Sequence, residues 1–198
     1  PPKTLTWEQA QEVVKPLPEV MLFRTEKEML DTFLDMIDDA DVLSGWNSEG
    51  YDIPYIVNRI TKTLGKAETR RMCLLKKLPK TRSYEKFGKD VNTYDLVGRI
   101  HLDYLELYRK YNYEERHSYR LDYIGEMEVG EKKVPYEGSL DRLYNHDFLK
   151  FCEYNIQDVM LLDKMDKKLQ FIDLANLIAH ENTVLIPTTM GAVATTEQ

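Results

Sequence analysis

Apolar residues recur at helical spacing over long parts of the chain. Between Glu26 and Asp39 an apolar position returns every three or four residues, and acidic side chains occupy the other face, which predicts an amphipathic helix. Another helix is predicted over Ile53–Leu64, because Pro54 is tolerated in a first turn and Gly65 follows the last one. The remaining helices are predicted over Thr6–Val14 with a Thr6/Gln9 capping box, 66–80, 104–111, Ser118–Met127 and His146 to about Ile178.

Short apolar runs between these helices predict strands. The segment from Tyr84 to Val97 is rich in Thr, Tyr and Val and predicts a hairpin with its turn near Gly88. Strands that alternate with helices predict an α/β domain built around a largely buried sheet. The other predicted strands are Val20–Arg24, Asp41–Trp46 and Gly98–Asp103.

The composition narrows the class of protein. With 198 residues and 42% apolar side chains, the chain can bury the core of one domain, or of one domain with a short appendage. The net charge of −7 argues against tight non-specific binding to duplex DNA, but not against an enzyme that holds a few nucleotides. The two cysteines, Cys73 and Cys152, are too few for a disulfide scaffold and suit a reducing cytosol.

Targeting signals do not appear in the sequence. No apolar run approaches the roughly 18 residues of a membrane-spanning helix, and no signal peptide opens the chain, so neither a membrane partner nor secretion is expected. The chain begins Pro1-Pro2 without an initiator Met. We therefore expect it to be a piece of a longer protein.

The first candidate for chemistry follows the predicted strand 41–46. A turn of small residues leads to Asp52, which stands just before a helix that Pro54 begins. In open α/β sheets ligands gather at the carboxyl ends of strands, so Asp52 is well placed to hold a cation. The alternative is that Asp52 caps the helix through backbone amides, and the residues alone leave both roles open.

The second candidate is the pair Tyr154 and Asp158 on the longest predicted helix. There Phe148, Cys152, Ile156 and Val159 centre the apolar stripe, and Asp158 falls on its border, one turn after Tyr154. A carboxylate at the rim of a packed face needs compensation by a salt bridge or a metal ion. Both remain open from the residues.

Two basic segments have a functional and a structural interpretation. Residues 130–136 contain Lys132 and Lys133, and residues 76–82 contain three lysines and Arg82. Either segment could contact a phosphate, or could be solvated surface. The sequence lacks Cys and His at zinc spacing, a Gly-rich phosphate loop and a Gly-x-Ser-x-Gly elbow.

Taken together, these motifs resemble family B DNA polymerases. Asn47-x-x-x-Tyr51-Asp52 after a Gly-Trp strand end resembles the family's second exonuclease motif, and Tyr154-x-x-x-Asp158 resembles the third. The intervening phrases 102–104 and 118–124 are similar to the polymerases of bacteriophages with contractile tails. The resemblance extends from about Glu26 to Ile172.

The resemblance implies a domain with a ribonuclease H-like fold, in which helices flank a mixed sheet. It also implies that the domain removes mismatched 3′-terminal nucleotides and that four carboxylates hold two divalent ions, Mg²⁺ or Mn²⁺, for this reaction. It implies the following residue roles: Asp52 and Asp158 as metal ligands, Tyr154 as the group that orients the attacking water, Lys133 as a lysine near the active site, and Asn47 and Tyr51 as contacts to the terminal nucleotide. The implied partners are a single-stranded 3′ end, the remaining polymerase domains and, through regions outside this sequence, a sliding clamp. The implied location is the cytoplasm of an infected bacterium.

One family motif is missing. The first motif, Asp-x-Glu on the first strand, does not occur, since no Asp in the chain has Glu two residues later. We expect that this fragment begins after that strand, is inactive alone and binds one metal ion or none. The domains then expected are an approach segment 1–18, the exonuclease domain 19–179, and residues 180–198 leading to the next domain. The alternative is a non-catalytic nucleic-acid-binding or structural module of a larger replication protein.

Overall fold

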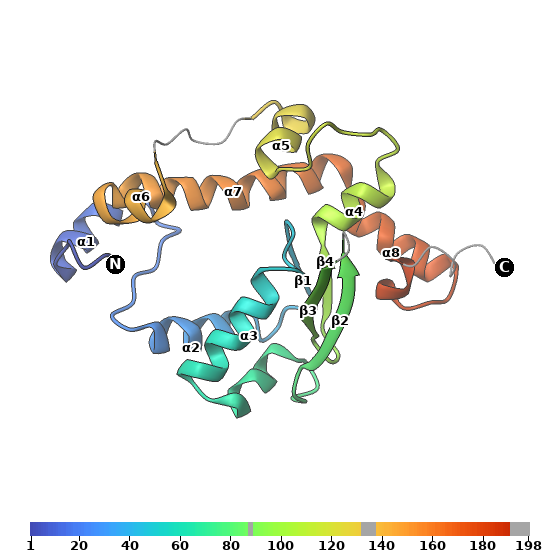
Figure 1. The fold of residues 1–198 in the computed structure, drawn as a ribbon, viewed down its shortest axis with the longest axis horizontal. Helices are drawn as coiled ribbons and strands as arrows, with labels where there is room; N and C mark the ends of the chain where they lie inside the picture. Colours follow the sequence, from blue (N-terminus) through green and yellow to red (C-terminus); the bar gives the residue numbers. More distant parts are fainter. Residues whose placement is uncertain (87–88, 132–137, 191–198) are drawn as a thin grey trace. The chain divides into compact units, whose positions relative to one another are not determined.

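The chain forms two compact units in a computed structural model that describes residues 1–86, 89–131 and 138–190 (Figure 1). Unit 1 comprises Pro1–Met29 and His117–Leu169, and unit 2 comprises Leu30–Arg116 and the part of the chain from Gln170 onward. Unit 1 is helical, whereas unit 2 contains all the described strands. The α/β class predicted from the sequence is confirmed.

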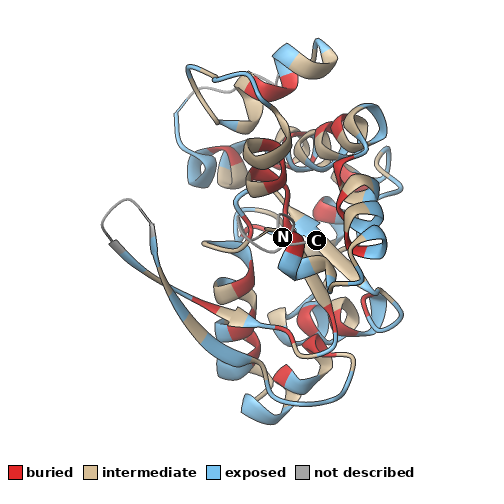
Figure 2. Cartoon of the chain, turned by 90° about the vertical axis from the view of Figure 1, so that its right-hand side faces the viewer, coloured by how far each residue is buried: buried red, intermediate tan, exposed pale blue. Residues whose placement is uncertain are grey.

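Two pairs of strands organise unit 2. Strand β1 (Val42–Gly45) pairs in parallel with β4 (Ile100–Asp103), in a register that places Gly45 opposite Asp103. Strand β2 (Lys80–Lys86) pairs with β3 (Lys89–Asp95) as an antiparallel hairpin, most of which is exposed or half-buried in Figure 2. The helices of this unit are α2 (Glu26–Met36, from Leu30 onward), α3 (Asp52–Thr63), α4 (Tyr104–Tyr111), α8 (Phe171–Glu181) and the 3₁₀ helices η1 (Lys66–Met72) and η2 (Ile186–Met190).

The core of unit 2 lies between α2, α3 and η1. Leu34, Ile60 and Met72 have no exposed surface, and they pack together with apolar residues of α3 and the start of the β3–β4 connection. Arg99 is also buried and donates from Nε to the Met72 carbonyl at 3.0 Å and from Nη1 to the carbonyls of Ile37 and Ala40. This one side chain therefore satisfies carbonyls at the ends of two helices, groups that a helix leaves without internal partners.

Helix α7 (Phe148–Leu169) is the long element of unit 1. Helices α1 (Trp7–Val14) and α6 (Leu140–His146) pack near its start, and α5 (Leu121–Val129) packs farther along. The predicted capping box of Thr6 and Gln9 is confirmed, with both reciprocal hydrogen bonds present. At Gly125 the two helices approach closely, because a Cβ there would lie 2.5 Å from Cδ2 of Leu161.

Three predictions of local structure were wrong. Residues 20–24 form no strand. The segment predicted as a helix over 66–80 is a 3₁₀ helix that ends at Met72. The long helix predicted from His146 to Ile178 breaks at Gln170, whose left-handed φ of 54° separates α7 from α8. The apolar pattern continues across that break, because both helices bury a face.

The buried face of α7 also differs from the predicted stripe. Val159 is 70% exposed, whereas Tyr154, Leu161 and Met165 are buried. The reason is that α7 packs against different helices along its length, so the buried side is not a single straight stripe. The basic loop predicted near 130–138 falls largely on residues 132–137, outside the described residues.

Other expectations from composition can be compared with the structure. Both cysteines are free thiols and buried. Within the described residues, no helix combines the length and apolar character needed to cross a bilayer.

Candidate nuclease site at the ends of strands β1 and β4

The loop that joins β1 to α3, residues 46–51 and here called the β1–α3 loop, carries Asn47 and Tyr51 of the segment that resembles the second exonuclease motif. Because β1 and β4 are parallel, their carboxyl ends lie side by side, and the residues that follow both strands meet at one edge. The loop turns sharply at Asn47, which has a left-handed φ of 58°. Asn and Asp adopt this conformation more readily than most residues.

Asp103, the last residue of β4, holds the β1–α3 loop. Its Oδ1 accepts from the backbone N–H of Asn47 at 2.9 Å, and its Oδ2 accepts from that of Glu49 at 3.1 Å. The side chain also caps α4, since Oδ1 accepts from the N–H of Leu105 at 3.0 Å. Desolvation raises the pKa of the Asp103 carboxyl, and the three amides oppose that shift.

Further contacts tie the same loop to β4 and to the hairpin. Ser48 donates to the Gly45 carbonyl at 3.0 Å, and its Oγ lies 2.9 Å from Nε2 of His101 on β4. Thr93 of β3 donates to the Glu49 carbonyl at 2.7 Å. Burial, aided by the positive charge of Arg82, lowers the pKa of His101 to about 4, so the ring is neutral at pH 7.

Asp52 is the first residue of α3 and is exposed. The N-cap position belongs to Tyr51, whose side chain makes no cap hydrogen bond, so the structure does not place Asp52 at the cap. Partial desolvation raises the pKa of the Asp52 carboxyl, although its own backbone N–H acts in the other direction. A bound cation would offset that desolvation, because an opposite charge favours the carboxylate form.

The other residues of the second motif lie in the same loop. Tyr51 is 66% exposed, and its ring stacks on Tyr55 with centroids 6.1 Å apart. Asn47, Tyr51 and Asp52 therefore lie on one short segment. An exposed tyrosine beside the motif is suited to stacking on a single-stranded base.

Tyr154 and Asp158 lie four residues apart on α7 in unit 1. Tyr154 is buried and Asp158 is half-buried. Asp52 belongs to unit 2, and the convergence of Asp52 with Asp158 stays a prediction. Lys133 lies outside the described residues.

The fit of the described side chains to a metal ion is partial. Carboxylate oxygens are the ligands that Mg²⁺ and Mn²⁺ prefer, and Asp52 offers an exposed one. However, no group of three or more His, Cys, Asp or Glu side chains within residues 1–86, 89–131 and 138–190 is arranged to hold a metal ion. Two acids at this edge of the strands have other partners, since Glu49 pairs with Arg82 and Asp103 accepts from backbone amides.

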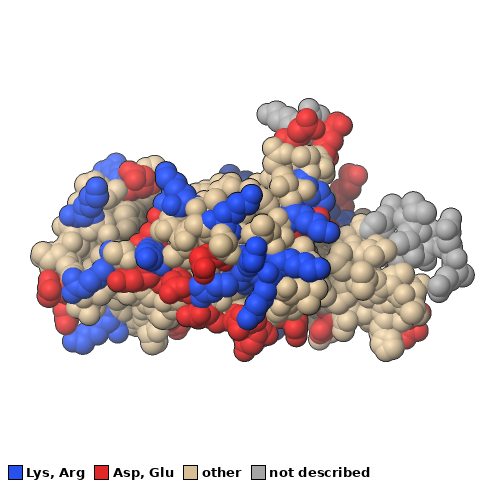
Figure 3. Space-filling model, turned by 90° about the horizontal axis from the view of Figure 1, so that it is seen from below, with Lys and Arg blue, Asp and Glu red and all other residues tan. Residues whose placement is uncertain are grey.

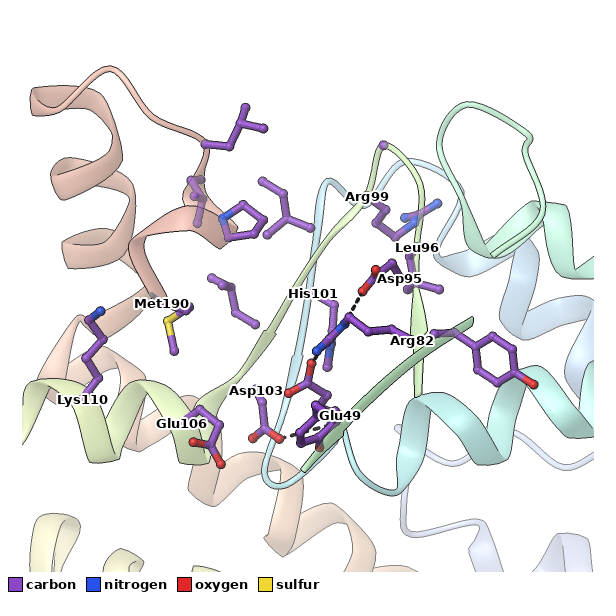
Figure 4. Close-up of a pocket in the computed structure, with 18 of the residues that line it drawn as sticks. Glu49, Arg82, Asp95, Leu96, Arg99, His101, Asp103, Glu106, Lys110 and Met190 are labelled. Carbon is purple, nitrogen blue, oxygen red and sulfur yellow. Dashed lines mark hydrogen bonds and ion pairs between the residues drawn. The ribbon is translucent and has the colours of Figure 1, made fainter. Parts of the chain in front are cut away.

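A pocket of about 1250 Å³ lies in unit 2, beside β4 (Figure 4). On one side Arg82 joins Glu49 of the loop to Asp95 of β3, the latter at 2.8 Å from Nε. The pocket is lined by both acidic and basic side chains. The face of the molecule in Figure 3 is also mixed in charge, because Lys and Arg lie among Asp and Glu there. The residues of this region that the sequence did not single out are Glu49, His101, Asp103 and Glu106.

One of these residues carried a signal in the sequence. Asp103 ends a predicted strand directly before a predicted helix, and Asp52 likewise follows a predicted strand. The strand-end argument that selected Asp52 therefore applies equally to Asp103. Nothing comparable marked His101, and the sequence marked Arg82 only as part of the basic segment 76–82. The roles of both residues depend on which strands become neighbours.

Comparison with known proteins places the chain in a family. Residues 3–124 match the sequence profile described as DNA polymerase family B, exonuclease domain. The chain is 34% identical over 157 residues to the DNA-directed DNA polymerase of Escherichia phage RB69. The aligned residues cover 78% of this chain and 17% of that polymerase. It is 31% identical over 156 residues to the DNA-directed DNA polymerase of Enterobacteria phage T4, with the same two shares.

A relative from outside the bacteriophages gives the same result. The DNA polymerase of Bombyx mori nuclear polyhedrosis virus is 31% identical over 160 residues, covering 78% of this chain and 16% of that polymerase. The chain thus spans no more than 17% of the length of these three relatives. The family resemblance seen in the motifs is confirmed, and the mixed α/β architecture agrees with a ribonuclease H-like exonuclease domain. The chain belongs to the family B DNA polymerases and carries their exonuclease domain.

Proposed function

We propose that this chain is the 3′→5′ proofreading exonuclease region of a viral DNA polymerase. The observation that supports it best is the position of Asp52, exposed beyond the carboxyl ends of β1 and β4 and inside the segment that matches the exonuclease family. A frayed single-stranded 3′ end is the substrate that suits such a site, because unpairing costs least at a mismatch.

In this proposal Asp52 and Asp158 are metal ligands, and carboxylates from a part of the polymerase outside this sequence complete the site. Two divalent ions, when bound, activate the attacking water and stabilise the leaving oxygen. The hydroxyl of Tyr154, one helical turn before Asp158, holds the water in line with the terminal phosphodiester. Asn47 and Tyr51 contact the terminal nucleotide, and Lys133 contacts a phosphate or the carboxylate cluster.

The overall reaction in this proposal is hydrolysis. Water forms a bond to phosphorus, the bond from phosphorus to the 3′-oxygen breaks, and that oxygen takes up a proton to become the new 3′-hydroxyl. The products are a nucleoside 5′-monophosphate and a strand one nucleotide shorter. A single carboxylate pair holds two divalent ions poorly, so we expect this chain alone to show little or no activity.

The wider setting follows from the same proposal. Residues 1–18 approach the domain, 19–179 form it, and 180–198 lead to the next polymerase domain. The remaining domains and, through them, a sliding clamp are the proposed protein partners. The proposed location is the cytoplasm of an infected bacterium.

The test uses the polymerase that carries this sequence. Asp52→Asn and Asp158→Asn should each abolish degradation from a single-stranded 3′ end while DNA synthesis stays at the wild-type rate. Asp163→Asn is the matched control, since Asp163 is on the same helix as Asp158 and pairs only one turn away with Lys167. Unchanged degradation in either of the first two variants would refute the site.

A further inference from the structure

We propose that Asp103 is a positioning residue for the nuclease site, whose buried carboxylate holds the β1–α3 loop in the conformation that presents Asp52. The inference rests on the proposed function, in which Asp52 is a metal ligand. The inference adds Asp103 to the residues on which the nuclease site depends. Asp103 acts by holding the backbone of the loop and not by contact with the substrate.

The contacts of Asp103 show what it holds. Its two oxygens together accept from the amides of Asn47 and Glu49 in the loop and of Leu105 in α4, at 2.9, 3.1 and 3.0 Å. The residue is only 5% exposed. A carboxylate so buried is costly unless it is hydrogen-bonded, and charge-assisted bonds to amides are among the stronger ones.

The loop needs such a partner because its conformation is uncommon. Asn47 has a left-handed φ of 58°, a conformation that residues other than glycine seldom adopt. The turn is also tight, since a Cβ on Gly45 would lie 2.9 Å from Cβ of Ser48. Backbone of this kind persists where surrounding contacts determine it.

The contacts continue from the loop to the metal-binding residue. The Ser48 carbonyl, between the two amides that Asp103 binds, accepts from the N–H of Ile53 at 2.9 Å. Ile53 is buried and directly follows Asp52. Moving the loop therefore moves the first turn of α3, and Asp52 with it.

A simpler role for Asp103 is that it only caps α4 through Leu105. The variant Asp103→Asn separates the two roles, because Asn is as good an N-cap as Asp and keeps one acceptor oxygen. Its –NH₂ group, however, cannot accept from an amide. At least one loop amide that Asp103 binds then loses its acceptor, whichever way the Asn side chain is turned.

The experiment compares Asp103→Asn with wild type in the polymerase that carries this sequence. We expect kcat for 3′→5′ degradation to fall about 10- to 100-fold and the half-saturating Mg²⁺ concentration to rise by a similar factor, as for other residues that orient metal ligands. DNA synthesis should not change. Ser44→Ala is the matched control, since it removes a 2.8 Å bond from β1 to the Leu102 carbonyl but leaves the loop amides paired, so degradation should stay at the wild-type rate.

A second measurement, independent of activity, follows amide hydrogen exchange. In an Asp103→Asn variant that still caps α4, the amide of Glu49, which Oδ2 binds, should lose more protection than the amides of Asn47 and Leu105, which share Oδ1. Wild-type kcat and Mg²⁺ dependence, or unchanged protection of both loop amides, would overturn the inference. If Asp52→Asn leaves degradation intact, the proposed function fails, and the exchange of the loop amides still decides whether Asp103 holds the loop.

Discussion

His101 makes the stability of unit 2 depend on pH. Its folded pKa is about 4, against an ordinary value of 6.5, because burial and the charge of Arg82 disfavour the protonated ring. Between these two values the unfolded chain binds more protons at this position than the folded one. The contribution of His101 to stability is therefore complete above pH 6.5 and is lost as the pH falls toward 4.

The size of the effect follows from the two pKa values. At pH 7 the difference between the folded and unfolded pKa of His101 hardly changes the free energy of unfolding, whereas at pH 5 it lowers that free energy by about 2 kcal/mol. The variant His101→Gln keeps a polar group near Ser48 Oγ but does not titrate. We therefore expect the stability of wild type to fall by about 2 kcal/mol relative to His101→Gln between pH 7 and pH 5.

The assay is urea denaturation at several pH values in that range. The background variant Trp7→Phe leaves Trp46 as the reporter, and Trp46 lies in the β1–α3 loop with its ring 6.0 Å from that of Tyr108. The difference in the free energy of unfolding between wild type and His101→Gln cancels the pH dependence of the groups that both proteins share. One of these is Asp103, whose raised pKa acts in the opposite direction. A difference that stays flat from pH 7 to pH 5 would refute the burial argument.

Two further predictions concern packing and can be measured by denaturant unfolding. Gly125→Ala gains about 1 kcal/mol of helix propensity, but it should lose more by overpacking against Leu161, which is fully buried, for a net destabilisation of about 1–2 kcal/mol. Adding Leu161→Ala should relieve the clash. An increase in stability on Gly125→Ala would contradict this prediction. Arg99→Leu should destabilise unit 2 by about 3–5 kcal/mol, since buried carbonyls lose their donor, with Arg99→Lys intermediate. Equal stability of Arg99→Lys and wild type would show that the charge alone matters.

The candidate site was partly predictable because its motifs are local. Asn47, Tyr51 and Asp52 lie within six residues, and the parallel strand before them was visible as an apolar run, so their common position followed from the chain itself. Asp103 could have been found by the same strand-end argument. Its role in holding the loop could not, because the loop amides it accepts from lie more than fifty positions earlier in the sequence.

What the sequence determined by itself was the α/β class, the helix starts marked by caps and Pro, and the family motifs, since each depends on periodicity or short spacing. The tertiary structure alone decided that α7 buries Tyr154 and Leu161 while exposing Val159, and that the continuous helical pattern breaks at Gln170. It also decided that His101 is half-buried beside Ser48 and that Arg99 joins two helix ends. These features depend on which surfaces meet across long stretches of chain, and hydrophobic periodicity reports that a face is buried without reporting against what.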